Sequence, residues 1–124
     1  YVSSKFGKRR DPFNRRTRMH GGIDFAGPHG TDIYSVAGGV VSFAGRKGGY
    51  GITVEIDHGD ELVSRYAHLT KALVEKGSVV KKADRIALMG STGRSTGPHL
   101  HLEILEAGER VNPESYLNQA ASDR

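Results

Sequence analysis

The sequence predicts a mainly β fold: a compact antiparallel β-sheet with a loop-walled groove and minimal helix. Short apolar runs of strand length dominate the chain, and none approaches the roughly 18 residues of a membrane span. The 17 glycines punctuate these runs, as expected of turns between short strands. Ile52, Val54 and Ile56 alternate with polar residues, which is typical of a strand with one buried face.

The expected elements follow from these patterns. Gly21-Gly22 disfavours a helix and leads into a strand over Ile23 to Ala26. Further strands are expected at residues 32–36, 39–44, 52–57, 62–68, 85–89 and 100–105. Residues 48–51 and 58–60 are expected to form turns between neighbouring strands.

Helix is expected only in two short segments. Residues 70–75 are expected to form one or two turns, and residues 113–117 a short terminal helix with Pro113 in its first turn. Residues 1–118 are expected to form one domain, followed by a frayed polar tail at 119–124. The 36% hydrophobic content and the absence of tryptophan predict a modest core of valine, isoleucine, leucine and alanine.

The segment His99-Leu100-His101 carries the strongest chemical signal in the chain. Histidines at i and i+2 of a strand point to the same face. Leu100, Leu102 and Ile104 then point to the opposite face and are expected in the core. This arrangement suits a metal site with a second, free histidine beside it.

Two upstream segments offer partners for these histidines. His20 and Asp24 form an H-x-x-x-D motif, and the glycines between them let an imidazole and a carboxylate approach one ion. His68 ends a strand-like run in which Ser64, Tyr66 and His68 are expected to alternate onto one face.

The three motifs resemble those of the LytM/lysostaphin-type zinc metallopeptidases of bacterial cell walls. H-x-x-x-D, Tyr-Ala-His-Leu and an H-x-H that follows Ser-Thr-Gly-Pro stand in the family's order, and the resemblance extends over about residues 3–117. The chain looks most similar to the Gram-negative murein DD-endopeptidases. The resemblance implies a barrel-sandwich hybrid type of fold, with residues 1–118 as the peptidase domain.

The resemblance also implies the roles of the site residues. One zinc ion would be bound by His20, Asp24 and His101, and the catalytic pair would be His68 and His99. Catalytic zinc commonly has three protein ligands and an open position, which this ligand set would provide. The chain has no H-E-x-x-H motif, so histidine is the natural group to move protons. We therefore expect a zinc-activated water assisted by two histidines, whose individual roles the sequence leaves open.

The expected reaction is hydrolysis of peptide cross-links in peptidoglycan, at the D-Ala–meso-diaminopimelate bond. Alternatives are a glycyl-glycine endopeptidase of lysostaphin type and a non-hydrolytic LytM domain that binds peptidoglycan or activates amidases. A structural zinc site is disfavoured because such sites are usually rich in cysteine, and this chain has none. Lys81-Lys82 resembles the modified lysine position of lipoyl or biotinyl carriers, a weaker alternative. His29 and His58 are expected to lie outside the site.

The charge and the first residue of the chain bear on its expected partners and cellular compartment. The net charge is +4. Basic residues crowd the first 18 positions, at Lys5, Lys8, Arg9, Arg10, Arg15, Arg16 and Arg18. They lack interleaved aromatic residues, so nucleic acid is not an expected partner, whereas the carboxylates of peptidoglycan peptides are. Because the chain begins with Tyr1 rather than Met, we expect a fragment of a longer exported protein. The family resemblance implies the periplasm or cell envelope of a Gram-negative bacterium, and nothing in the sequence demands more than a monomer. A membrane tether or regulatory domain could lie outside this chain.

Overall fold

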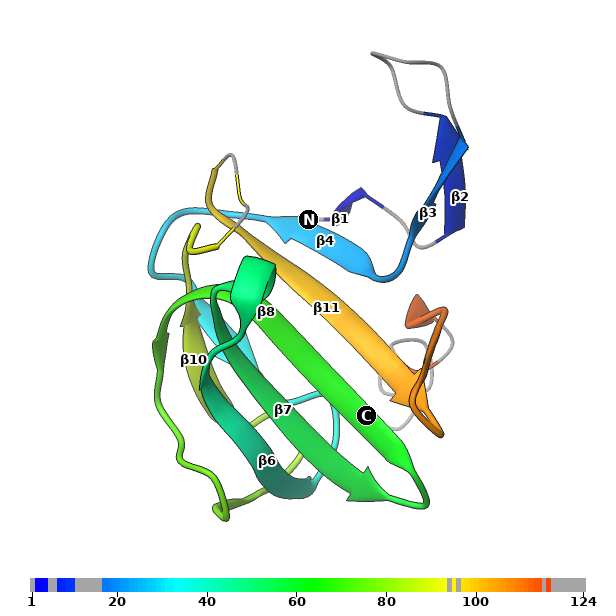
Figure 1. Cartoon of the computed structure of the whole chain (residues 1–124). Coiled ribbons are helices and arrows are strands. Elements are labelled where there is room, and N and C mark those ends of the chain that lie inside the picture. Colours follow the sequence, from blue (N-terminus) through cyan, green and yellow to red (C-terminus); the bar gives the residue numbers. More distant parts are fainter. Residues whose placement is uncertain are drawn as a thin grey trace.

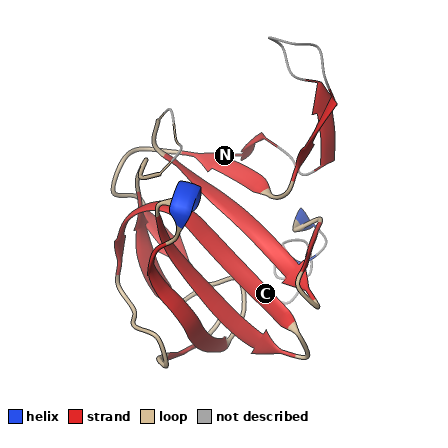
Figure 2. Ribbon diagram, viewed as in Figure 1, coloured by secondary structure: helices blue, strands red, loops and turns tan. Residues whose placement is uncertain are grey.

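The computed structural model describes residues 2–4, 7–10, 17–93, 95, 97–114 and 116, with side chains from residue 21 onward. Strands dominate it (Figures 1 and 2). In chain order they are β1 (Val2–Ser4), β2 (Gly7–Arg10), β3 (Thr17–His20), β4 (Ile23–Ala26), β5 (Asp32–Tyr34), β6 (Gly39–Arg46), β7 (Ile52–Gly59), β8 (Leu62–Ala72), β9 (Val79–Val80), β10 (Arg85–Met89), β11 (His99–Glu106) and β12 (Glu109–Val111). A single 3-10 turn, η1 (Gly48–Tyr50), joins β6 to β7 within the described residues.

Ten of the described strands form one antiparallel sheet. Its main path runs β1-β4-β11-β8-β7-β6-β9, while β10 pairs with β5 and β8, and β12 pairs with β11. The path has two ends, so the described sheet is not a closed barrel. Strands β2 and β3 form a separate two-stranded sheet (Figure 1). The predicted mainly β, antiparallel fold with minimal helix is confirmed.

The seven strands predicted from residue 23 onward are all present: β4 and β10 match, β6, β7, β8 and β11 are two to four residues longer, and β5 ends at Tyr34, two residues earlier than expected. Strands β9 and β12 were not predicted, because each is too short to show a pattern. The helix predicted at residues 70–75 is wrong. Strand β8 continues to Ala72, because Lys71 and Ala72 pair with Leu88 and Ala87 of β10. Tertiary pairing overrides the weak local preference there.

The terminal helix prediction falls at the limit of the described residues. Glu114 and Tyr116 are helical, whereas Leu117 and the tail at 119–124 lie outside the described residues, as does the boundary at residue 118. No helix in the described part of the chain is long and apolar enough to cross a membrane.

The core lies on one face of the long strands β7, β8 and β11. Leu100, Leu102 and Ile104 are buried, as the alternation in β11 predicted. They pack in one cluster with apolar residues of β7 and β8, including Val54 and Leu69. Burial of this face fixes the register of β11, because a slip of one residue would turn its apolar side chains to the other face.

Two loops meet backbone to backbone at one end of this sheet. Gly51 follows η1, and Gly93 lies in the connection from β10 to β11. Both have left-handed φ, of 70° and 74°, and a Cβ on either would collide with the backbone of the opposite loop. Glycine at both positions therefore permits the contact that joins the two loops.

This contact predicts a large difference between two glycine substitutions. Gly93→Ala should lower the free energy of unfolding by about 3 kcal/mol, because left-handed strain adds to overpacking. Gly77→Ala is the matched control, since Gly77 also has left-handed φ (93°) but open space around its Cβ position. It should cost only about 1 kcal/mol of strain. Urea unfolding of both variants measures the difference, and equal losses would contradict a tight loop contact.

Candidate active site

Strands β4 and β11 bring three of the predicted site residues together. In the register of these strands, His101 lies opposite Asp24 and His99 opposite Ala26. The Oδ1 atom of Asp24 lies 2.6 Å from Nδ1 of His101 and 4.0 Å from Nε2 of His99. His99 and His101 share the face opposite the core, as their i, i+2 spacing predicted.

His68 joins this group from β8 through a β-bulge. Ile52 pairs with Leu69 but Val54 pairs with Tyr66, so two residues of β8 oppose one residue of β7. His68 has a left-handed φ of 61° at this bulge. Its ring centroid lies 4.8 Å from that of His99 and 6.0 Å from that of His101.

The bulge corrects the prediction that Ser64, Tyr66 and His68 share a face. Tyr66 is buried in the core, where its hydroxyl lies 2.9 Å from Ser64 Oγ and accepts a hydrogen bond from the backbone N–H of Val36. The extra residue turns His68 to the other face, beside His99. Strict alternation along β8 would have placed the His68 ring in the core.

Backbone carbonyls fix the orientation of both His68 and His99. Nδ1 of His68 donates to the carbonyl of Thr92 over 2.7 Å, and Nδ1 of His99 donates to the carbonyl of Gly97 over 3.0 Å. A carbonyl oxygen only accepts, so each Nδ1 carries a hydrogen and each neutral ring has its free lone pair on Nε2. Burial lowers the pKa of His68 below its ordinary value, which favours the neutral ring.

The backbone of His20 lies at the end of β3, directly before Gly21 and Gly22. Neither glycine has positive φ; a Cβ on Gly21 would instead collide with the Arg110 side chain, and one on Gly22 with the carbonyl of Leu102. The two glycines therefore permit close packing rather than a left-handed turn. The side chain of His20 is not among those described, and the described residues alone contain no group of three metal-ligating side chains.

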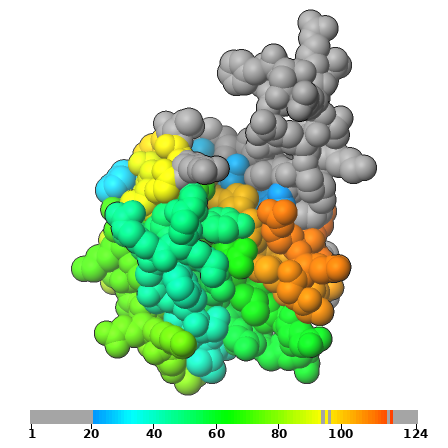
Figure 3. Space-filling model, in the orientation of Figure 1, coloured from blue at the N-terminus to red at the C-terminus, as the bar shows by residue number. Residues whose placement is uncertain are grey.

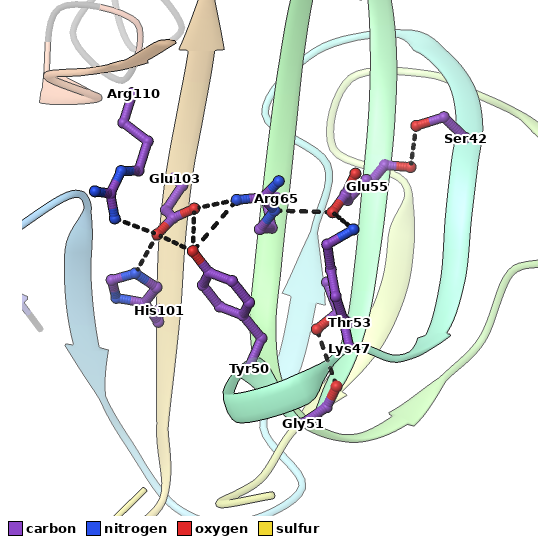
Figure 4. Close-up of polar contacts among 10 residues, drawn as sticks. All are labelled: Ser42, Lys47, Tyr50, Gly51, Thr53, Glu55, Arg65, His101, Glu103 and Arg110. Atoms are coloured by element: carbon purple, nitrogen blue, oxygen red, sulfur yellow. Dashed lines mark hydrogen bonds and ion pairs between the residues drawn. The ribbon is translucent and has the colours of Figure 1, made fainter. Parts of the chain in front are cut away.

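Glu103 is a site residue that the sequence analysis missed (Figure 4). This carboxylate is 1% exposed and accepts hydrogen bonds from Nε2 of His101 (2.9 Å) and from Nη1 of Arg65 (2.6 Å). Burial alone would raise its pKa, but these two donors outweigh burial and hold the pKa below the ordinary value. Its i+2 spacing from His101 was the signal that it shares the site face.

Tyr50 was also missed, because it is the last residue of η1, in the connection between β6 and β7, and belongs to no motif. Its hydroxyl donates to the Glu103 carboxylate, at 3.0 and 3.1 Å from the two oxygens. A pocket is lined by Gly49, Tyr50, His68 and His101. Figure 3 shows the same face, with the teal segment around residue 50 beside the gold and orange residues of β11 and β12.

The remaining histidines with described side chains lie outside this group, as expected. His58 contacts the carbonyl of Gly38 and the hydroxyl of Ser64, each at 2.7 Å. His29 is exposed in the connection between β4 and β5.

Curated bacterial endopeptidases are similar to this chain in sequence. DD-carboxypeptidase/endopeptidase Mpg of Neisseria meningitidis serogroup B is 47% identical over 114 residues, which is 92% of this chain and 26% of that protein. Peptidoglycan DD-endopeptidase ShyA of Vibrio cholerae is 46% identical over 112 residues, which is 90% of this chain and 26% of that protein. The chain therefore spans about a quarter of the length of these two relatives.

Solved structures show the same fold. A zinc-containing peptidase from Vibrio cholerae superposes with a TM-score of 0.85 at 40% identity, covering 94% of this chain and 36% of that one. The catalytic domain of lysostaphin from Staphylococcus simulans superposes with a TM-score of 0.84 at 29% identity, covering 95% of this chain and 92% of that one. The model of peptidase family M23 matches residues 18–113. As the resemblance to LytM/lysostaphin-type peptidases predicted, the chain belongs to peptidase family M23.

Proposed function

We propose that the chain is a zinc-dependent endopeptidase that hydrolyses peptide cross-links of peptidoglycan, at the D-Ala–meso-diaminopimelate bond. The observation that carries the proposal is the convergence of Asp24, His68, His99 and His101 beside one pocket. The names of Mpg and ShyA support the substrate and the DD bond.

The described part of the site fits a metal ion. A neutral His101 ring has one N–H for two carboxylate neighbours, Glu103 at Nε2 and Asp24 at Nδ1, and with the hydrogen on Nε2 its lone pair lies on Nδ1. That lone pair faces the Asp24 carboxylate across 2.6 Å, and two acceptors at this distance repel each other unless a cation or proton lies between them. We propose that Asp24, His101 and His20 hold one zinc ion there.

A zinc ion held by this set would polarise a substrate carbonyl and lower the pKa of a bound water. His68 and His99 supply the proton chemistry in our proposal. A neutral ring accepts a proton at Nε2, and a protonated ring donates a hydrogen bond from Nε2 to the oxygen that becomes negative in the transition state. The carbonyls of Thr92 and Gly97 hold Nδ1 of each ring, which leaves Nε2 for these tasks.

The organisms of these relatives, Neisseria meningitidis and Vibrio cholerae, and the word peptidoglycan in the name of ShyA support the proposed surroundings. We infer that the chain acts in the periplasm or cell envelope of a Gram-negative bacterium, on peptidoglycan stems and cross-links. Because the chain spans about a quarter of Mpg and ShyA, additional domains or a membrane tether in the whole protein are part of this proposal.

Metal-free protein should lose stability as the pH rises. Burial lowers the pKa of His101, but hydrogen bonds to Asp24 and Glu103 outweigh it and raise the pKa to about 9. Because the pKa of His101 is higher in the folded chain, its protonation stabilises the fold. This stabilisation is fully present below the unfolded-state pKa of about 6.5 and is lost as the pH rises through about 9. The free energy of unfolding should fall by on the order of 3 kcal/mol across this window. Urea unfolding after chelator treatment checks this, and a flat profile identical to that of His101→Gln would contradict it.

The ligand and proton-transfer roles predict different outcomes for two sets of variants. His68→Ala and His99→Ala should keep one zinc per chain and lose turnover by about 10²- to 10⁴-fold, the usual contribution of general acid–base catalysis. Asp24→Asn and His101→Ala should lose the zinc itself. Metal analysis of the purified variants, beside peptidase assays, separates the two sets. Loss of zinc from His68→Ala or His99→Ala would move that residue into the ligand set.

The substrate is tested by digesting purified cross-linked Gram-negative peptidoglycan and identifying the products by mass spectrometry. We expect cross-linked dimers to disappear and uncross-linked peptides to appear, and a zinc chelator to stop the reaction. If the chain cleaves polyglycine peptides and leaves the cross-linked dimers intact, the scissile bond is a glycyl bond and not the D-Ala–diaminopimelate bond. No cleavage of either substrate by the zinc-loaded chain would favour a binding role.

A further inference from the structure

Glu103 is a charged side chain buried directly behind the proposed metal ligand His101. Burying a carboxylate carries a desolvation cost of several kcal/mol, and apolar residues in the place of a buried ion pair often give equal or greater stability. Its burial, at 1% exposure, is therefore poorly explained by stability alone. The atoms that it contacts indicate a functional reason.

We propose that Glu103 is a positioning residue that sets the tautomer and orientation of the His101 ring for the metal. The inference rests on the proposed zinc site. Both ring nitrogens of His101 face a carboxylate, Nε2 facing Glu103 across 2.9 Å and Nδ1 facing Asp24 across 2.6 Å, and a carboxylate only accepts hydrogen bonds. When a metal replaces the hydrogen between Nδ1 and Asp24, the Glu103 contact holds the remaining ring hydrogen on Nε2. The lone pair on Nδ1 then points toward Asp24, where the metal is proposed. Ligating histidines commonly donate their second N–H to such a partner.

The carboxylate is itself held on several sides (Figure 4). Sheet register places Glu55, Arg65 and Glu103 side by side on β7, β8 and β11. Arg65 donates to Oε1 of Glu103 over 2.6 Å, and Arg110 lies 3.7 Å from Oε2. Because Tyr50 lies at hydrogen-bond distance from both oxygens, rotation of the carboxylate would break several contacts at once.

Glutamine at position 103 isolates this role. Glu103→Gln keeps the size of the side chain but has one acceptor oxygen, while Arg65, Tyr50 and His101 all present donors. The positively charged Arg65 should take that oxygen, which turns the amide NH₂ toward His101. The His101 ring would then have to carry its hydrogen on Nδ1, the atom proposed to bind the metal.

The test is the zinc affinity of the whole chain, measured by competition with a chromophoric chelator. Glu103→Gln should weaken zinc binding by about 10- to 100-fold, the usual effect of removing such a partner. Glu55→Gln is the matched control, because the Glu55 carboxylate also pairs with Arg65 (2.8 Å) but has Lys47 (3.3 Å) as its other ion-pair partner. This control should bind zinc as the wild type does, even where urea unfolding shows an equal loss of stability. Wild-type affinity in Glu103→Gln, or equal weakening in both variants, would overturn the proposal.

A second measurement does not depend on zinc. Nitrogen-15 NMR of the metal-free chain with Asp24→Ala, in which Nδ1 of His101 no longer faces a carboxylate, reports which nitrogen of the neutral ring carries the hydrogen. In this Asp24→Ala background we expect Nε2–H when Glu103 is present and Nδ1–H when Glu103→Gln is added, and the same tautomer in both would overturn the proposal. A wild-type chain that binds no zinc would instead contradict the proposed function, while the tautomer result would still decide the role of Glu103. Should Glu103→Gln not fold, Glu103→Asp, one methylene shorter, should also weaken zinc binding, and wild-type affinity there would overturn the proposal.

Discussion

The antiparallel pairing of β11 with β4 on one side and β8 on the other is the constraint on which the site depends. Backbone hydrogen bonds fix His101 opposite Asp24 and opposite Ala67. Segments more than 30 residues apart in sequence therefore meet through the ladder and need no long loop to reach each other. The opposite face of β11 packs Leu100 and Leu102 into the core, so core packing and site geometry depend on the same register.

A layer of alternating charge crosses the site face of the sheet. Glu55, Arg65 and Glu103 lie in one cross-strand row, and Tyr50 covers it from the loop between β6 and β7. The Arg65 guanidinium lies 5.0 Å from the centroid of the Tyr50 ring, a distance at which cation and ring attract each other. The row connects the loop that lines the pocket to the strand that carries the histidines.

The sequence was most informative where a single strand decides the outcome. Alternation in β11 correctly placed His99 and His101 on one face and Leu102 in the core, because a period of two needs no knowledge of neighbouring strands. The alternation rule failed for His68, because the bulge arises from the pairing of β8 with β7 and has no signature in the amino-acid sequence of β8. Glu103 could have been found by extending the same alternation by one step, whereas Tyr50 depends on how two loops pack.

The backbone of His68 carries a cost that its neighbours in β8 do not. Left-handed φ disfavours every L side chain, by roughly 1–2 kcal/mol for most of them, and glycine alone avoids the penalty. A glycine there would relax the bulge while removing the imidazole, so chain stability and the chemistry of this position oppose each other. Selection for stability alone would favour replacement of this histidine. Its presence at a strained backbone position therefore indicates selection for function.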